Sequence, residues 1–117
     1  MNNFLGPYSL DFETIDINVL SNSIGNYLIC SLGKDGKYYV LYVGRSDVDL
    51  NDRLKDHVNE EQNYKYFFFK YAKSDVDAYN VECKCYHEYG ENEKLNNIYH
   101  PDKPNGKTYV KCYFCGK

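Results

Sequence analysis

Two short apolar runs, Tyr27–Leu32 and Tyr38–Val43, constrain the fold of this chain more than any other feature. Both runs are rich in β-branched and aromatic residues, which suit the half-buried surface of a sheet. The sequence GKDGK between them supplies turn glycines, so the two runs predict an antiparallel hairpin. A hairpin alone does not explain its outer ends, where one glycine stands two residues before Tyr27 and another two residues after Tyr42.

A helix is predicted over residues 50–59, after the loop RSDVD. Asp49 is placed to cap its first turn and to interact favourably with the helix dipole. Leu50, Leu54 and Val58 recur at every fourth residue, which is typical of the buried face of a helix.

The aromatic segment YKYFFFKYA, residues 64–72, predicts a third strand. A second helix is predicted over residues 75–89. Ser74 and Asp77 form a variant of the capping box at its start, and Gly90 ends the helical pattern.

The predicted order of elements is β-β-α-β-α followed by a tail. This order indicates an α+β fold with a small, mainly three-stranded antiparallel sheet flanked by helices. We expect residues 1–23 to be an N-terminal extension packed on the domain, residues 24–100 to be the domain itself, and residues 101–117 to be a loop-rich tail with a short strand at 109–114. The 117 residues suit a single domain.

Charge and composition narrow the classes of function. The net charge of −3 disfavours a large non-specific footprint on nucleic acid, although the lysines of the second half allow a local basic patch. No apolar run approaches the roughly 18–20 residues of a membrane-spanning helix. The N-terminus lacks the pattern of a secretory signal, and with five cysteines this predicts a reducing, cytoplasmic location.

Two pairs of polar residues stand at spacings that need an explanation. Tyr27 and Tyr42 lie at ends of the hairpin that the turn brings together, either as site residues or as a stacked pair in the core. Arg53 and His57 are four residues apart and share one face of the predicted helix, where such a pair is ordinarily solvated.

Two single residues add to these pairs. Glu82 lies in the middle of the second helix among apolar and aromatic neighbours. On a solvent-facing side it needs no partner, but on a partly buried side it needs a cation, either an arginine or a metal ion. Asn97 precedes His100 in a loop stiffened by two prolines, where asparagine is ordinarily a turn former.

Together these features form an ordered pattern: Gly-x-Tyr, Tyr-x-Gly, arginine and histidine on one helix face, glutamate on a later helix, and a late asparagine. The pattern resembles the GIY-YIG nuclease family and spans Gly25 to Asn97. The resemblance implies a small antiparallel sheet flanked by helices. It also implies these site residues: Tyr27, Tyr42, Arg53, His57, Glu82 and Asn97, with Asn96 as an alternative for the last.

The two tripeptides depart slightly from the family pattern. The first reads Gly-Asn-Tyr, with Asn26 where isoleucine is usual, and the second reads Tyr-Val-Gly. Because the central residue of each tripeptide points away from the tyrosine, we expect Asn26 to alter packing or exposure rather than chemistry.

The resemblance implies a metal-dependent endonuclease that hydrolyses phosphodiester bonds, with DNA favoured over RNA. Tyr27 would act as the general base or pass the proton of water onward, and a phenol with a pKa near ~10 needs nearby positive charge for this task. Tyr42 would hydrogen-bond water or phosphate, and His57 would orient a group or accept a proton. Arg53 would bind phosphate oxygens, and Glu82 would hold Mg²⁺ or Mn²⁺, weakly in the absence of substrate.

Two other classes of function stay open. One is a catalytically weak module of the same fold that binds nucleic acid or a protein, and the other is a small interaction domain whose tyrosines are structural. A non-catalytic descendant does not need all of these site residues together, so their combination favours the enzyme. One active site cuts one strand, so cutting a duplex would require a homodimer or sequential nicking, and the acidic balance suggests a protein partner.

The tail sequence CYFCGK is similar to half of a zinc knuckle. Cys112 and Cys115 would need two further ligands, which Cys83 and Cys85 are badly placed to supply together because they differ by about 200° around a helix. A mixed zinc site with His87 or His100 is one alternative. Ordinary thiols are the other, and the sequence favours them.

Overall fold

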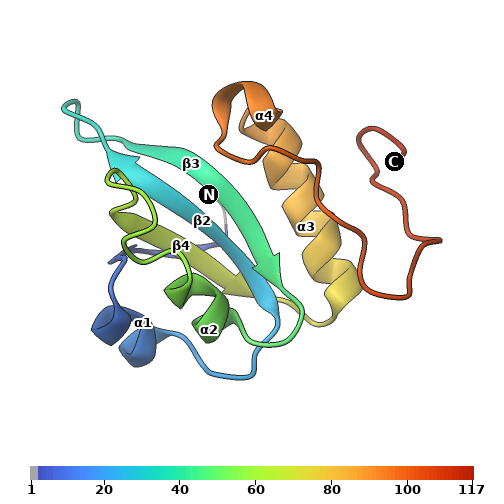
Figure 1. Ribbon diagram of the computed structural model, residues 1–117, viewed down its shortest axis with the longest axis horizontal. Helices are drawn as coiled ribbons and strands as arrows, with labels where there is room; N and C mark the ends of the chain where they lie inside the picture. Colours follow the sequence, from blue (N-terminus) through green and yellow to red (C-terminus); the bar gives the residue numbers. More distant parts are fainter. Residues whose placement is uncertain (1–2) are drawn as a thin grey trace.

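The computed structural model, which describes residues 3–117, contains a four-stranded antiparallel sheet in the order β1-β4-β2-β3 (Figure 1). The strands are β1 (Leu5–Ser9), β2 (Gly25–Leu32), β3 (Tyr38–Ser46) and β4 (Tyr66–Tyr71). The predicted α+β class and antiparallel sheet are confirmed, and the prediction of mainly three strands was wrong by one.

The additional strand, β1, lies in the segment expected to be an extension. It pairs with β4 at the sheet edge, with Leu5 opposite Phe69 and Tyr8 opposite Phe67. The register shifts between these pairs, where Gly6 has a φ of +130° and a Cβ would lie 2.8 Å from the carbonyl oxygen of Phe67. The sequence LGPYS does not resemble a strand because glycine and proline weaken central strands, but an edge strand tolerates both.

The hairpin of β2 and β3 forms as predicted. Leu32 stands opposite Tyr38 next to the turn, and Gly25 stands opposite Ser46 at the open end. The pairing shifts by one residue near Ile29, so β3 carries a bulge in its middle. Because β3 is the last strand of the sheet, one of its edges faces away from β2.

Four helices accompany the sheet: α1 (Phe12–Asn18), α2 (Leu50–Lys55), α3 (Asp75–Glu88) and α4 (Glu91–Lys94). The capping predictions are confirmed for both predicted helices. The side chain of Asp49 accepts a hydrogen bond from the backbone N–H of Asp52 at the start of α2, and the side chain of Ser74 accepts one from the N–H of Asp77 at the start of α3. The predicted helix over 50–59 is too long. The chain leaves α2 after Lys55 and turns through Asn59, which has a φ of 64°.

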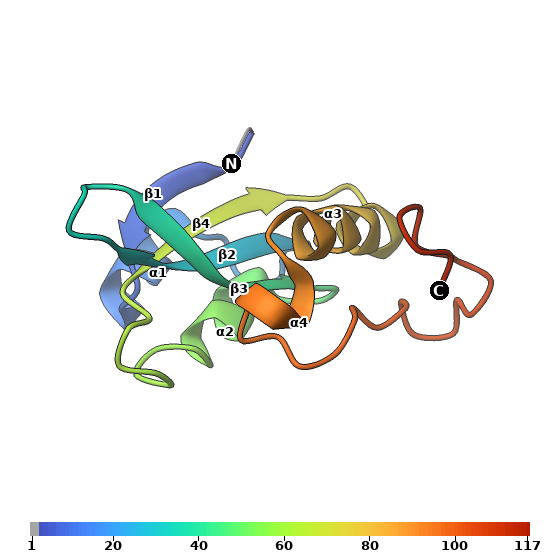
Figure 2. The ribbon, with the colours of Figure 1, turned by 90° about the horizontal axis from the view of Figure 1, so that it is seen from above.

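The helices cover both faces of the sheet (Figure 2). On one face α1 and α2 pack against the odd-numbered residues of β2, and Leu50 and Leu54 are fully buried there, as the helical stripe predicts. Val58 is partly buried against the same cluster. On the other face α3 packs over Leu28 and Cys30. Successive residues of β2 therefore face two separate cores in alternation.

The chain after α4 follows the edge of β3 and then α3 without forming a strand (Figures 1 and 2). The backbone N–H of Asn96 donates to the carbonyl of Leu41 at 2.7 Å, so this segment covers the β3 edge. The predicted strand over 109–114 was wrong. Residues of that segment instead form turns, and Tyr113 is 85% exposed. Among residues 3–117, no helix has the length and apolar character needed to cross a membrane.

Candidate active site

A pocket of about 420 Å³ lies at the edge of β3. Because β3 is an edge strand, side chains from both faces of the sheet reach this pocket. The segment after α4 closes its remaining side. The residues that line it and bear on its chemistry are Tyr42, Arg45, Asp47, Arg53, Glu82 and Asn97. Four of the predicted site residues therefore meet at one pocket, although they come from β3, α2, α3 and the following loop.

Tyr27 and His57 form the layer behind Tyr42. Tyr27 is 1% exposed, and its ring stacks on that of Tyr42 with centroids 6.3 Å apart and an interplanar angle of 16°. The imidazole of His57 contacts both tyrosines, with ring centroids at 5.2 Å and 4.9 Å. The pair is not directly opposed, since Tyr27 faces Gly44 and Tyr42 faces Ile29, so the tyrosines are diagonal neighbours.

Both glycines of the pattern have a packing reason. A Cβ on Gly44 would overlap the Tyr27 ring, which lies across the strand from it. A Cβ on Gly25 would overlap the carbonyl oxygen of Lys70 and lie 2.8 Å from Leu50. The first glycine of the motif thus allows α2 and β4 to approach β2, and the second makes room for a buried tyrosine.

A chain of hydrogen bonds indicates which ring nitrogen of His57 donates and which accepts. The Tyr27 hydroxyl lies 2.7 Å from Nε2 of His57, and Nδ1 lies 2.9 Å from a carboxylate oxygen of Glu60. A carboxylate only accepts, so Nδ1 is the protonated nitrogen and Nε2 accepts the hydrogen bond of the tyrosine. His57 is therefore placed to take a proton from Tyr27, although it lies beyond the end of α2 rather than within it.

The environment of Tyr27 disfavours a free phenolate. Burial raises the pKa of Tyr27 well above its ordinary value, the neighbouring Tyr42 raises it further, and the positive charge of Arg53 opposes both. Burial likewise raises the pKa of Tyr42, again against Arg53. Deprotonation of Tyr27 thus needs an acceptor for its proton, and His57 is hydrogen-bonded to it.

Arg53 brings a positive charge to the pocket from α2. Its side chain is 48% exposed, and its ion pair with Asp56 is long, at 3.7 Å. An exposed pair of this length contributes little, so Asp56 does not keep the guanidinium from an anion. The guanidinium also hydrogen-bonds Tyr27 and Tyr42. The charge of Tyr27 and Tyr42, when ionised, would raise the pKa of Arg53 in turn, which places the three groups within electrostatic reach of one another.

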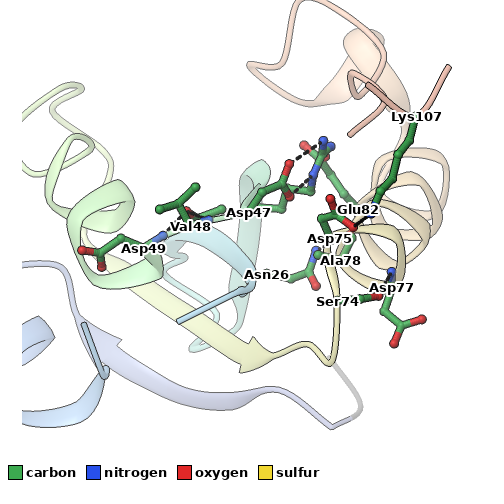
Figure 3. A network of polar contacts seen from close by, with 12 residues as sticks. Asn26, Asp47, Val48, Asp49, Ser74, Asp75, Asp77, Ala78, Glu82 and Lys107 are labelled. Carbon is green, nitrogen blue, oxygen red and sulfur yellow. Dashed lines mark hydrogen bonds and ion pairs between the residues drawn. The ribbon is translucent and has the colours of Figure 1, made fainter. Parts of the chain in front are cut away.

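Glu82 is held by an arginine that the sequence pattern does not single out. NH1 of Arg45 lies 2.5 Å from Oε1 of Glu82, and the same guanidinium bonds Asp47 through Nε at 2.8 Å. The side chains of Arg45 and Glu82 are 10% and 11% exposed. Asp47 and Glu82 both belong to the network of polar contacts drawn in Figure 3. The requirement for a cation next to a partly buried Glu82 is therefore met by an arginine.

Burial raises the pKa of Glu82 to about 7, while the charge and hydrogen bond of Arg45 lower it and Asp47 raises it. The carboxylate retains one free ligand atom, because none of the described residues donates a hydrogen bond to Oε2. An anionic oxygen at the wall of a polar pocket suits a hard divalent cation, and Asp47 and Asp102 line the same pocket. The residues present thus fit Mg²⁺ or Mn²⁺, with Arg45 as a competitor for Glu82.

Asn97 fastens the covering segment to β3. Its side-chain amide donates to the carbonyl of Val43 at 2.8 Å and accepts from the N–H of Val43 at 3.0 Å. The side chain therefore extends the sheet by one pair of hydrogen bonds, and both polar atoms are occupied. Asn96 is exposed and bonds Tyr64. Asn97 is a positioning residue for the pocket wall, and beyond these two bonds its amide keeps one N–H and one lone pair.

Asn26, the departure from the family pattern, lies on the opposite face from the tyrosines. It is buried beside α3, and its amide donates to the carbonyl of Ala78 at 2.8 Å (Figure 3). Its Oδ1 has no hydrogen-bond partner among the described residues. Asn26 stands opposite Arg45 in the hairpin, so it borders the Arg45–Glu82 pair without joining it.

Arg45 and Asp47 are the charged residues of the pocket that the sequence pattern misses. Arg45 could have been found from its position, because it directly follows the second tripeptide on a strand. A charged side chain that faces the core under α3 needs a partner of opposite charge. The tail cysteines, Cys112 and Cys115, lie outside the pocket.

Comparison with known proteins gives no relative for this chain: no family model, no curated protein and no solved structure matches it. The resemblance to the GIY-YIG nucleases rests on the residue pattern alone, and the geometry of the pocket carries the functional argument.

Proposed function

We propose that this protein is a divalent-metal-dependent endonuclease of the GIY-YIG type that hydrolyses phosphodiester bonds of nucleic acid, DNA in preference to RNA. The observation that carries the proposal is the hydrogen-bonded chain from Tyr27 through His57 to Glu60, placed behind a pocket that also contains Arg53 and Glu82. A proton acceptor, an anion-binding cation and a metal-binding carboxylate are the groups that hydrolysis of a phosphodiester requires.

The proton of the attacking water passes through Tyr27. The phenol oxygen accepts this proton as its own proton moves to Nε2 of His57, which leaves Tyr27 neutral and His57 positively charged. The carboxylate of Glu60 stabilises the imidazolium through Nδ1. This route avoids an isolated phenolate, which burial disfavours because it raises the pKa of Tyr27.

The phosphate is bound by Arg53 and Tyr42. The planar guanidinium of Arg53 donates to two phosphate oxygens, and its attraction grows as negative charge accumulates in the transition state. Tyr42 lines the pocket, and its hydroxyl group donates a hydrogen bond to water or phosphate. Its stacking on Tyr27 fixes the position of that hydroxyl relative to the proton path.

Glu82 would hold the divalent cation with the part of its carboxylate that Arg45 leaves unoccupied. When bound, the cation supplies positive charge that neutralises the phosphate and stabilises the leaving oxygen. A single carboxylate already paired with arginine predicts weak affinity for the cation before substrate binds.

The Arg45–Glu82 ion pair also supports a second candidate function. An arginine at 2.5 Å neutralises Glu82 without any metal, as expected for a module of the same fold that binds nucleic acid or a protein without cutting it. In such a module Arg53 and Asp47 would contribute to binding, and the Tyr27–His57 pair would be part of the core.

A cleavage assay separates the two functions. The purified chain is incubated with plasmid DNA, single-stranded DNA and RNA, with and without Mg²⁺ or Mn²⁺, beside the variants Arg53→Ala and Glu82→Gln. Matched controls are Lys55→Ala, a neighbouring cation on α2 that binds Asp16, and Glu88→Gln, an exposed glutamate at the end of α3. We expect metal-dependent cleavage that both site variants lose and both controls retain.

Cleavage that persists in both site variants contradicts the mechanism. Binding without cleavage of any substrate, weakened by Arg53→Ala and independent of metal, supports the non-catalytic module instead. Because one pocket cuts one strand, the order in which nicked and linear plasmid accumulate also tests whether two copies of the chain act together.

A further inference from the structure

The tail folds back on α3 so that four potential metal ligands converge beside the pocket. They are His87, His100, Cys112 and Cys115, and one ligand atom of each lies within 4.8 Å of all the others. Nε2 of His87 lies 3.5 Å from Sγ of Cys112, and Nε2 of His100 lies 3.3 Å from Sγ of Cys115. Three segments separated in sequence thus contribute to one small cluster.

These spacings suit tetrahedral zinc. With Zn–S bonds of about 2.3 Å and Zn–N bonds of about 2.0–2.1 Å, a nitrogen and a sulfur ligand lie about 3.5 Å apart around one ion. Two thiolates and two neutral imidazoles also balance the charge of Zn²⁺. Sulfur and imidazole ligands together select zinc over the hard cations expected at Glu82.

Both histidines have the outer hydrogen bond that a zinc ligand needs. Nδ1 of His87 lies 2.6 Å from the carboxylate of Glu91, and Nδ1 of His100 lies 3.0 Å from the carbonyl oxygen of Pro101. These acceptors place the ring proton on Nδ1, so the unprotonated Nε2 of each ring faces the two sulfurs. The same tautomer in both rings, aimed at the same point, is the arrangement that binds a metal.

The Cys-x-x-Cys turn is itself preorganised. The backbone N–H of Phe114 donates to Sγ of Cys112 at 3.4 Å, and the N–H of Gly116 donates to the carbonyl of Cys112 at 2.8 Å. Gly116 has a φ of +77°, which the glycine permits without strain. Cys112 is buried against Tyr79 and Cys83 of α3, so the turn is held next to His87 by packing.

We propose that His87, His100, Cys112 and Cys115 form a structural zinc site that fastens the tail to α3. The tail contains no strand, and the Lys107–Asp75 ion pair at 2.6 Å is a further polar attachment of the tail to α3. His100 also lines the pocket at Glu82, so the zinc fixes the pocket wall as well as the tail. The zinc site does not depend on the proposed nuclease activity. None of the four zinc ligands takes part in the proposed proton transfer or in phosphate binding.

Metal binding by the purified full chain tests this site directly. Zn²⁺ is added to reduced protein in the presence of a chromophoric chelator, which gives the stoichiometry and the affinity. We expect one zinc per chain, and a loss of affinity in His87→Ala and Cys115→Ser beyond the about 100-fold that loss of an outer-shell group can cause. The matched control is Cys85→Ala, a cysteine of α3 that faces the sheet core, which keeps the affinity of the original chain.

The outer hydrogen bond provides a second, milder variant. Glu91→Ala leaves all four ligands in place and is expected to lower the affinity for Zn²⁺ about 10- to 100-fold, whereas the exposed neighbour Glu93→Ala changes nothing. Cys115 and Glu91 are exposed, so neither substitution removes a core contact.

Substitution of Co²⁺ for zinc gives a readout of the ligands. We expect the intense visible bands of tetrahedral cobalt with a thiolate-to-metal charge-transfer band, and the latter weakened in Cys115→Ser. Absence of stoichiometric zinc, a cobalt spectrum without thiolate character, or equal affinity in Cys115→Ser overturns the proposal.

Discussion

Arg45 and Glu82 form an ion pair at 2.5 Å that joins the edge strand β3 to helix α3 across the inner wall of the pocket. Both side chains are about nine-tenths buried, since they are 10% and 11% exposed. Removing only one partner of this ion pair would destabilise the protein, because the charge of the other partner would stay buried without a counter-charge. The pair also affects the charge of the carboxylate that would hold the metal ion in the proposed mechanism.

The stability of the protein should depend on the titration of Glu82. Its pKa is raised to about 7 in the folded state by burial, against about 4.3 for an unfolded chain, so the folded state binds the proton more tightly. Its contribution to the free energy of unfolding is therefore greatest below pH ~4 and declines as pH rises to ~7, by roughly 1–3 kcal/mol. Urea unfolding of the original chain and of Glu82→Gln at pH 5, 6, 7 and 8 measures this change in the free energy of unfolding.

We expect the original chain to lose stability relative to Glu82→Gln over this range. A difference that is constant, or that grows in favour of the original chain as pH rises, would show that Arg45 outweighs burial. The same titration sets the sign for cleavage, because ionised Glu82 binds a divalent cation better. Metal-dependent activity should thus rise as pH passes through 7.

Tyr27→Phe should remove activity and leave the fold intact. The ring still fills its place against Gly44, and only the hydroxyl bonded to His57 is lost. We expect cleavage to fall by about 10²–10⁴-fold, the range of a general acid–base group, while unfolding changes by about 1 kcal/mol. Initial rates on the best DNA substrate and urea unfolding measure both.

The control for this prediction is Tyr64→Phe, because Tyr64 is another ring of the same aromatic cluster and its hydroxyl bonds Asn96. Cleavage by Tyr27→Phe at the original rate would exclude the proton path through His57.

Gly44→Ala should destabilise the protein through Tyr27. The new Cβ overlaps the tyrosine ring, and forcing an extra methyl group into a packed core costs about 1–3 kcal/mol. A double-mutant cycle with Tyr27→Ala provides the control. If the ring is the obstacle, the alanine at residue 44 costs much less once the ring is gone, with a coupling energy of about 0.5–3 kcal/mol. Additive effects would mean that Gly44 is needed for another reason.

Asn97→Ala should loosen the wall of the pocket. Val43 is 1% exposed, and without the asparagine its N–H and C=O lose their partners at the strand edge. Each buried group left unpaired costs about 1–3 kcal/mol. Asn96→Ala, at an exposed neighbour whose side chain bonds only Tyr64, is the matched control.

Amide hydrogen exchange distinguishes the two variants. Asn97→Ala should speed exchange in residues 95–102 and in β3, whereas Asn96→Ala should leave both near the original rates. Equal protection in the two variants would mean that the backbone bond from Asn96 to Leu41 is sufficient to hold the segment.

The sequence predicts what depends on local pattern. The hairpin, α3 and the buried stripe of α2 follow from alternation, capping residues and helical spacing, and they form where predicted. β1 escapes prediction because Gly6 and Pro7 weaken the strand signal, while its pairing with β4 depends on contacts far along the chain.

The site is predictable to a similar extent. Tyr42, Arg53 and Glu82 meet at one pocket, as their motif suggests. Arg45 could not be assigned to Glu82 from sequence, because the two meet only after α3 packs on the sheet. The convergence of His87 and His100 on the tail cysteines likewise depends on the path of a loop without regular structure.

Tyr42 and Arg45 are three residues apart on β3, so they point to opposite faces of the sheet and still border the same pocket. If β3 slipped along β2 by one residue, the two side chains would exchange faces and each would leave its partners on α2 or α3. The pocket therefore exists in only one strand register. The complete pocket also requires the segment after α4 in place along the strand edge, so two separate parts of the fold must both form before a ligand can meet all of its contacts.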